Sequence, residues 1–120
     1  MRFDHLSIPV TNWIASRDWY VNVLGLTVEF QIPERHTVAL QDGNDFTFFL
    51  SEADNTVRSH GIAFTFQVDE VHAACAAIAA RGGRFSHPPQ KVFWGYGAEI
   101  ADPDGYLVRL WDEISMKEKG

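Results

Sequence analysis

The chain has 120 residues, of which 46% are hydrophobic and 22% are charged, and its formal net charge is −6. A chain of this size can bury an independent core, and 10 Lys and Arg against 16 Asp and Glu do not provide the basic surface that nucleic acid requires. No apolar run approaches the roughly 20 residues of a membrane-spanning helix. We therefore expect a single domain, residues 1–120, that binds neither nucleic acid nor membrane.

Cysteine usage and the amino terminus bear on the cellular compartment. The single cysteine, Cys75, cannot form an intramolecular disulfide bond. The amino terminus lacks the basic and apolar regions of a signal peptide. Both features are typical of proteins in a reducing compartment, so we expect a cytoplasmic location.

The beginning of the chain predicts a strand and then a helix. Apolar and polar side chains alternate over residues 3–10, which is typical of a strand with one buried face. Thr11 or Asn12 can cap a helix that runs to Leu24, because apolar residues recur there at helical spacing. Gly25 can adopt the left-handed conformation that ends such a helix.

The second half of the chain repeats these signals. Residues 63–68 again predict a strand, and Asp69 can cap a helix that ends at Gly82 and Gly83. The apolar face of this helix consists of Val71, Cys75, Ile78 and Ala79. In each half a turn sequence precedes a strand, namely Asp42-Gly43-Asn44 and Asp102-Pro103-Asp104-Gly105.

The two halves align with each other. At an offset of 58, Val10 falls on Val68 and Gly25 on Gly83, and at an offset of 60, residues 42–50 fall on residues 102–110. Each half therefore reads as strand, helix and further strands, or βαβββ. We predict an α+β fold of two such modules, one at about residues 1–55 and one at about residues 60–114.

Aromatic residues are frequent, with 4 Trp, 3 Tyr and 9 Phe, and most of them belong to the core. The segment Trp94-Gly95-Tyr96-Gly97 differs, because large rings alternate with glycines ahead of a predicted strand, and the rings can project from a permissive backbone. We expect Trp94 or Tyr96 to line a ligand cavity. The alternative is that this segment forms a packing corner.

Several of these motifs together resemble those of the vicinal-oxygen-chelate superfamily, which includes glyoxalases, extradiol dioxygenases, fosfomycin-resistance transferases and bleomycin-resistance proteins. The resemblance covers about residues 2–114 and implies that the two modules form a cup-shaped half-barrel. The motifs are Asp4-His5-Leu6, Leu24-Gly25-Leu26 followed by Phe30, the Val68-Asp69 step, Gly82-Gly83, and Asp102-Pro103-Asp104-Gly105-Tyr106.

The resemblance also implies where an enzyme of this superfamily would hold a divalent metal. The positions are His5, Phe49, Ala63 and Arg109, with Phe48 in place of Phe49 if the register shifts by one. Only histidine among them can donate to a metal, since phenylalanine and alanine have no lone pair and a guanidinium repels a cation. The remaining candidates, which are His36, His60, His72, His87, Glu52 and Glu99, have no ligand spacing. We therefore expect neither a metal nor another cofactor.

His5 and Arg109 each have two interpretations. The His5 ring either is hydrogen-bonded within the wall of the cavity or acts as a ligand contact or general base. Arg109 either forms an ion pair, with Asp4 or Glu99, or contacts an anionic or carbonyl group of a ligand. A charge in an apolar strand has to be paired or solvated in one of these ways.

The pattern without metal ligands is most similar to that of the bleomycin-resistance proteins, which hold a flat cationic aromatic drug between two subunits without modifying it. The resemblance implies a homodimer that sequesters an aromatic or cationic metabolite or antibiotic, and thus a role in antibiotic resistance. An acidic chain rich in rings suits such ligands. The residues expected to meet in one ligand cavity are His5, Phe49, Trp94, Tyr96, Arg109 and Trp111.

The alternative function is that of an enzyme, a glyoxalase- or dioxygenase-like lyase or isomerase in which His5 is the acid or base, or a metal enzyme with ligands at other positions. A third interpretation is a structural partner domain with a vestigial cavity. No nucleophile is evident, because Cys75 is expected on a buried helix face. The sequence does not decide whether the modules pair within one chain or swap between subunits.

Overall fold

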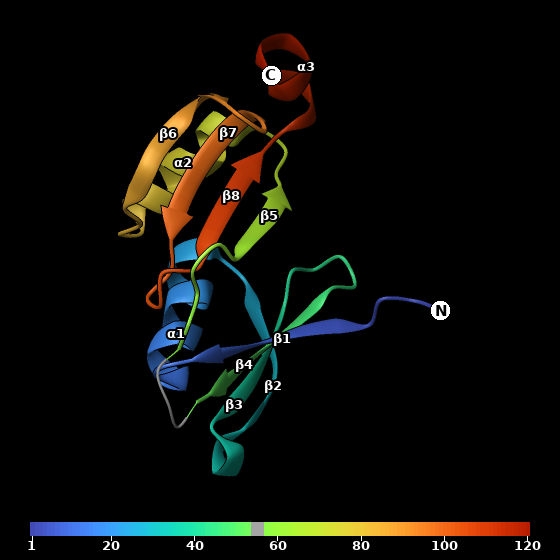
Figure 1. Ribbon diagram of the computed structural model, residues 1–120, viewed down its shortest axis with the longest axis vertical. Helices are drawn as coiled ribbons and strands as arrows, with labels where there is room; N and C mark the ends of the chain where they lie inside the picture. Colours follow the sequence, from blue (N-terminus) through green and yellow to red (C-terminus); the bar gives the residue numbers. More distant parts are fainter. Residues whose placement is uncertain (54–56) are drawn as a thin grey trace. The chain divides into compact units, whose positions relative to one another are not determined.

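The computed structural model describes residues 1–53 and 57–120. The chain divides into two compact units, residues 1–58 and residues 59–120, and each unit contains one four-stranded sheet with its helices (Figure 1). The boundary expected near residue 55 lies outside the described residues. Among the described residues, no helix has both the length and the apolar character needed to cross a membrane.

The first unit contains a sheet with the strand order β1-β4-β3-β2. Strands β1 and β4 run parallel, and the other neighbours are antiparallel. Helix α1 covers one face of this sheet (Figure 1). In chain order the elements are β1 (His5–Val10), α1 (Trp13–Trp19), the π-helical turn η1 (Tyr20–Leu24), β2 (Thr27–Ile32), the 3-10 turn η2 (Pro33–Arg35), β3 (Thr37–Gln41) and β4 (Thr47–Glu52).

The second unit contains a sheet with the corresponding order, β5-β8-β7-β6. Strands β5 and β8 run parallel, and the other pairs are antiparallel. A short helix that the sequence analysis did not anticipate follows the last strand. The elements are β5 (Ala63–Gln67), α2 (Val71–Ala80), β6 (Phe85–Val92), β7 (Gly95–Ala101), β8 (Leu107–Trp111) and α3 (Glu113–Lys119).

The predicted α+β fold of two βαβββ modules is confirmed, and the strand registers follow the sequence offsets. His5 pairs with Thr47 in the first sheet, and Ala63 pairs with Leu107 in the second. These pairs are related by the same offsets of 58 and 60 that align the two halves of the sequence. The repeat therefore describes strand pairing as well as element order.

The helix signals are confirmed in the first unit and corrected in the second. The side chain of Asn12 caps α1, and Gly25 is left-handed with φ 89°. In the second unit the N-cap is Glu70, whose carboxylate accepts a hydrogen bond from the backbone N–H of Ala73, and not the predicted Asp69. The repeat explains the correction, because Asn12 falls on Glu70 at the offset of 58.

The apolar face of α2 is smaller than predicted. Val71, Cys75 and Ile78 are buried against the sheet, but Ala79 is exposed. A step of one residue rotates a side chain by about 100° around a helix, so Ala79 points away from the face that Ile78 shares. Burial raises the pKa of the Cys75 thiol to about 11, which removes it as a nucleophile at neutral pH.

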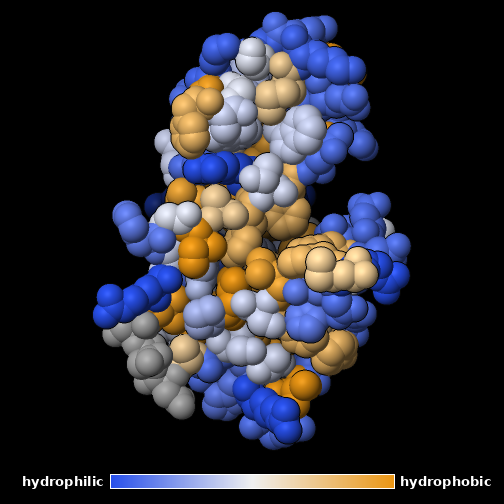
Figure 2. Space-filling view, turned by 45° about the vertical axis from the view of Figure 1, so that its right-hand side comes forward, coloured by the Kyte–Doolittle hydropathy of each residue, from blue (hydrophilic) through white to orange (hydrophobic). Residues whose placement is uncertain are grey.

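Each core lies between a sheet and its helices, and the opposite face of each sheet remains partly open. In the first unit Val38, Leu40, Phe48 and Leu50 are buried, and Tyr20 packs edge-on against Phe48. Hydrophobic side chains also reach the surface of each unit, where they appear orange in Figure 2. The open sheet faces carry most of the residues that the sequence analysis proposed for a site.

Candidate functional site

The open face of the first sheet brings together two of the predicted site residues. Along β4, Phe48 and Leu50 are buried on the helix side, whereas Thr47 and Phe49 point to the opposite face. His5 pairs in register with Thr47 and shares this open face. Phe49, and not the alternative Phe48, therefore neighbours His5.

His5 combines a polar and an aromatic contact. Its Nδ1 lies 2.8 Å from Asp4 Oδ2, and its ring meets the edge of the Phe49 ring at a centroid distance of 4.7 Å. The hydrogen bond from His5 is the main reason why the pKa of Asp4 is lowered, and the positive charge of Arg2 adds to it. The side chain of His5 is 44% exposed, so it is held by its neighbours and still accessible.

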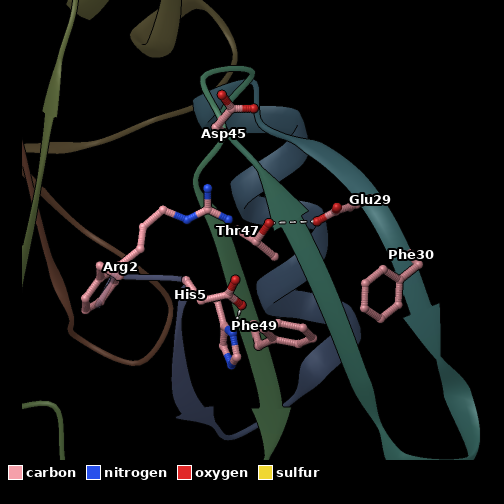
Figure 3. A pocket seen from close by; sticks show the side chains of 9 residues that line it. Arg2, His5, Glu29, Phe30, Asp45, Thr47 and Phe49 are labelled. Carbon is pink, nitrogen blue, oxygen red and sulfur yellow. Dashed lines mark hydrogen bonds and ion pairs between the residues drawn. The ribbon is translucent and has the colours of Figure 1, made fainter.

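A cleft of about 700 Å³ opens on this face, and His5 and Phe49 form part of its wall (Figure 3). Phe30 extends the aromatic surface, because its ring contacts the Phe49 ring edge-on at 5.6 Å. The volume is in the range of small-molecule sites. The cleft is lined by Arg2, Phe3, Asp4, His5, Glu29, Phe30, Asp45, Thr47 and Phe49.

A β-bulge explains why two consecutive residues of β2 reach the same cleft. The pairing of β2 with β3 shifts between Val28 and Phe30, and Glu29 is the additional residue. Successive side chains of a regular strand point to opposite faces, whereas a bulge re-aims one of them. Glu29 Oε2 consequently accepts a hydrogen bond of 2.9 Å from the Thr47 hydroxyl, while Phe30 remains part of the wall (Figure 3).

The charges of the cleft are predominantly negative. Asp4, Glu29 and Asp45 contribute three carboxylates, whereas Arg2 is the cleft's permanent cation. Aromatic rings and carboxylates in one concave surface favour a ligand that is both flat and positively charged.

The open face of the second sheet surrounds Arg109. Of the two ion-pair partners considered for it, the structure selects Glu99, whose Oε2 lies 3.1 Å from Arg109 Nε. The guanidinium carbon also lies 5.5 Å from the centre of the Phe93 ring and 5.8 Å from that of the Trp94 ring. Trp111 lies two residues further along β8 and therefore shares this face.

Gly97 is required by this arrangement. A Cβ atom at this position would overlap the Trp94 ring and the carbonyl oxygen of Leu110. The ring thus lies directly against the backbone of β7 beside Arg109. Sequence analysis attributed the glycines of this segment to backbone freedom, whereas the structure shows close approach at Gly97.

The structure does not bring Tyr96 to the surface that holds Trp94 and Arg109, which corrects that part of the predicted set. Strand β7 begins at Gly95, so Tyr96 lies inside the strand and points to the helix side. It is 9% exposed, its hydroxyl lies 3.0 Å from Nε2 of His72 on α2, and Lys119 of α3 covers its ring. The ring therefore belongs to the packing between β7 and its two helices.

The predicted site residues thus form two groups, one in each unit. His5 and Phe49 belong to the cleft of the first unit, and Trp94, Arg109 and Trp111 belong to the open face of the second. That these groups share one cavity remains a prediction. Sequence reasoning missed Glu29, Phe30 and Asp45, because only a bulge and a turn conformation bring them to the cleft.

The residues at the superfamily's metal positions do not fit a divalent cation. His5 has the ring of Phe49 beside it, and the carboxylate nearest to Arg109 is paired with that guanidinium. Among residues 1–53 and 57–120, no group of three or more His, Cys, Asp and Glu side chains is arranged to hold a metal. A site with one histidine lacks the three protein ligands of catalytic zinc.

Comparison with known proteins identifies the family and the fold. The model of the Glyoxalase/Bleomycin resistance protein/Dioxygenase superfamily matches residues 2–110. A search of the curated proteins found no match.

Three solved structures illustrate the likeness. TnmS3, an antibiotic binding protein from Streptomyces sp. CB03234, is 26% identical with a TM-score of 0.77 over 93% of this chain and 96% of that chain. A glyoxalase/bleomycin resistance protein from the same organism is 27% identical with a TM-score of 0.69, over 88% of this chain and 95% of that one. Integron cassette protein HFX_CASS4, from the mobile metagenome of the Halifax Harbour sewage outfall, shares the fold at 20% identity, with a TM-score of 0.77 and coverages of 92% and 97%.

The family model covers most of the chain, and the two βαβββ modules agree with it. The chain therefore belongs to the Glyoxalase/Bleomycin resistance protein/Dioxygenase superfamily.

Proposed function

We propose that the protein is a metal-free binding protein that sequesters an aromatic or cationic small molecule, such as a metabolite or an antibiotic, in the cleft of its first unit. The observation that carries the proposal is the meeting of Phe30, Phe49 and His5 with three carboxylates in one cleft of about 700 Å³. The rings supply stacking surface, and the carboxylates attract positive charge.

The comparisons are consistent with binding. One similar structure, at 26% identity, is described as an antibiotic binding protein. Three of the four metal positions of this chain, Phe49, Ala63 and Arg109, hold residues that do not coordinate a cation, so we propose no metal-dependent step. Sequestration in the cytoplasm by a homodimer, as a means of antibiotic resistance, completes the proposal.

The open face around Arg109 is proposed as a second contact surface of the same function. Phe93 is 90% exposed, although its ring lies against the guanidinium. Phe93 and Trp94 therefore offer stacking surface, and Trp111 extends it along β8. Tyr96 is no longer part of the proposed set, because it is packed under α3.

A lyase or isomerase remains the second candidate function because of the Asp4–His5 hydrogen bond. A carboxylate that orients a histidine is a common arrangement for acid–base chemistry, and this pair opens into a cleft. In that case His5 would exchange a proton with the bound molecule. Chemical change of a bound compound that is lost in His5→Ala would establish this function in place of simple binding.

Calorimetric titration of the native chain with flat aromatic compounds, charged and uncharged, tests the proposal. We expect saturable binding and recovery of the compound unchanged. Phe30→Ala should weaken the binding about three- to tenfold, because one stacked ring is lost. Ile14→Ala is the control, since this apolar side chain of α1 is also exposed and does not line the cleft. Absence of binding by every compound, or equal losses in both variants, would contradict the proposal.

A further inference from the structure

Asp45 has a backbone conformation that favours glycine. Its φ is 68°, in the left-handed region that residues with a Cβ atom adopt at a cost. The corresponding residue of the second module, at the offset of 60, is Gly105 with φ 85°. This position is therefore left-handed in both turns, once with glycine and once with aspartate.

The two turns also share the hydrogen bonds of their first aspartate. Asp42 Oδ1 accepts from the backbone N–H groups of Asn44 and Phe46, and Asp102 Oδ1 accepts from those of Asp104 and Tyr106. The turn is thus held by its first aspartate in both modules. The Asp45 side chain contributes none of these four bonds, so the turn itself gives no reason for a carboxylate at this position.

Asp45 is one of the lining residues of the cleft that carries the proposed function, and Figure 3 shows it at the top of the view. The other two carboxylates there have partners, since Asp4 is hydrogen-bonded to His5 and Glu29 to Thr47. Within residues 1–53 and 57–120, no hydrogen bond or ion pair involves the Asp45 side chain. Of the three carboxylates, Asp45 is therefore the one whose oxygens have no partner within the described part of the chain.

We propose that Asp45 determines the charge selectivity of the cleft, so that its ligand is an aromatic molecule carrying an amine or another positive group. This inference rests on the proposed function and narrows its ligand class. Aspartate at this position adds backbone strain and also places a negative charge at the rim of the cleft. Glycine, as at Gly105, adopts the same left-handed conformation without the strain. Strain retained beside a ligand cleft is consistent with a role in the site rather than in the fold.

Arg2 supports this assignment because it already brings a cation to the same place. Its side chain extends across the cleft toward the side of Thr47 and Asp45 (Figure 3), and its charge contributes to the lowered pKa of Asp4. Arg2 precedes β1 and belongs to no helix or strand. A ligand cation would compete with this guanidinium for the negative charges of the cleft.

Calorimetry with two flat probes of similar size tests the proposal. At neutral pH 9-aminoacridine is a cation and acridine is uncharged. The native chain should bind the cation more tightly. Asparagine has a similar shape to aspartate and also tolerates the left-handed region. Asp45→Asn should therefore weaken the binding of 9-aminoacridine about fivefold and leave the binding of acridine unchanged. Arg2→Gln should strengthen the binding of 9-aminoacridine by a similar factor.

Two further variants separate a role in the site from a role in the fold. Asp18→Asn removes an exposed carboxylate outside the cleft and should not change the preference for the cation. Asp45→Gly should bind like Asp45→Asn and unfold at a temperature equal to or above that of the native chain. A lower unfolding temperature for Asp45→Gly would overturn the proposal, because Asp45 would then serve the turn.

The outcomes also distinguish this proposal from the proposed function. Binding of both probes with no preference for the cation, or a preference that survives Asp45→Asn, would refute the role of Asp45 and leave binding intact. Failure of the native chain to bind either probe would count against both. Loss of the preference in Asp18→Asn would indicate a general effect of net charge and would also refute the role of Asp45.

Discussion

Glu52 and Asp112 occupy the same place in the two modules, although one is a glutamate and the other an aspartate. Each follows or ends the last strand of its module, and each carboxylate accepts a hydrogen bond from the backbone N–H of the first helical residue. Glu52 Oε1 lies 3.2 Å from the N atom of Trp13, and Asp112 Oδ2 lies 2.7 Å from that of Val71. In both modules this contact ties the last strand to the first helix.

Asp112 should contribute more to stability than Glu52. It is 1% exposed, and it accepts two further hydrogen bonds, from the backbone N–H and the hydroxyl of Ser115 at the start of α3. Asp112→Ala leaves these donors unpaired, so we expect a loss of about 2 kcal/mol in the free energy of unfolding. Glu52→Ala should cost about 1 kcal/mol or less. Urea unfolding measures both, and a larger loss for Glu52→Ala would contradict this ranking.

Asp112 should also make stability depend on pH. Its pKa is lowered from the ordinary value of 3.8, mainly by the hydrogen bond from the Ser115 backbone N–H. A carboxyl group with a lowered pKa in the folded state stabilises the fold above its unfolded pKa, and this contribution is lost as the pH falls through the folded pKa. The stability difference between native and Asp112→Asn should therefore be constant near neutral pH and shrink below about pH 4. A stability difference that stays constant in acid would argue against the Asp112 carboxylate as a source of pH dependence.

Gly97→Ala should displace the Trp94 ring from Arg109. The added methyl group overlaps the ring and the Leu110 carbonyl, so we expect a loss of about 1–3 kcal/mol and a change in tryptophan fluorescence. In a Trp94→Ala background the ring part of the overlap is absent, and Gly97→Ala should cost less. Equal costs in the two backgrounds would show that the ring is not packed against Gly97.

The chain should assemble as a homodimer. Strand β2 is an edge strand of the first sheet, and it exposes Val28 by 41% and Phe30 by 43%. Apolar residues on an open edge are usually covered in an assembly. Sedimentation of the native chain at micromolar concentration should give a dimer, and Val28→Lys should shift it toward monomer. A monomeric native chain would contradict this prediction.

The internal repeat made much of the fold predictable from the sequence. The offsets of 58 and 60 relate the strand registers of the two sheets. The family resemblance, not the repeat, put Phe49 near His5 with Phe48 as the alternative, and the structure has Phe49 there. Used further, the same offset would have assigned the second N-cap to Glu70, because Asn12 falls on it. A repeat is informative because two copies with the same backbone need the same caps and turns.

The remaining features depended on events that the residue pattern does not encode. Glu29 and Phe30 both reach the cleft because of a bulge, and Tyr96 points away from Trp94 because β7 begins one residue before it. A pattern of alternating glycines and rings does not reveal where a strand starts. Helix α3 could have been found from its cap at Asp112 and the Glu113–Lys117 pair at helical spacing.

Amide NMR spectra of the isotope-labelled native chain, titrated with 9-aminoacridine, test the central claim most directly. If the first-unit cleft is the binding site, the largest shift changes should occur at residues 2–5, around the bulge at Glu29, and at residues 45–49. These changes should saturate with added ligand and diminish in Phe49→Ala. An unchanged spectrum, or changes confined to the helix faces of α1 and α2, would contradict the assignment of the cleft.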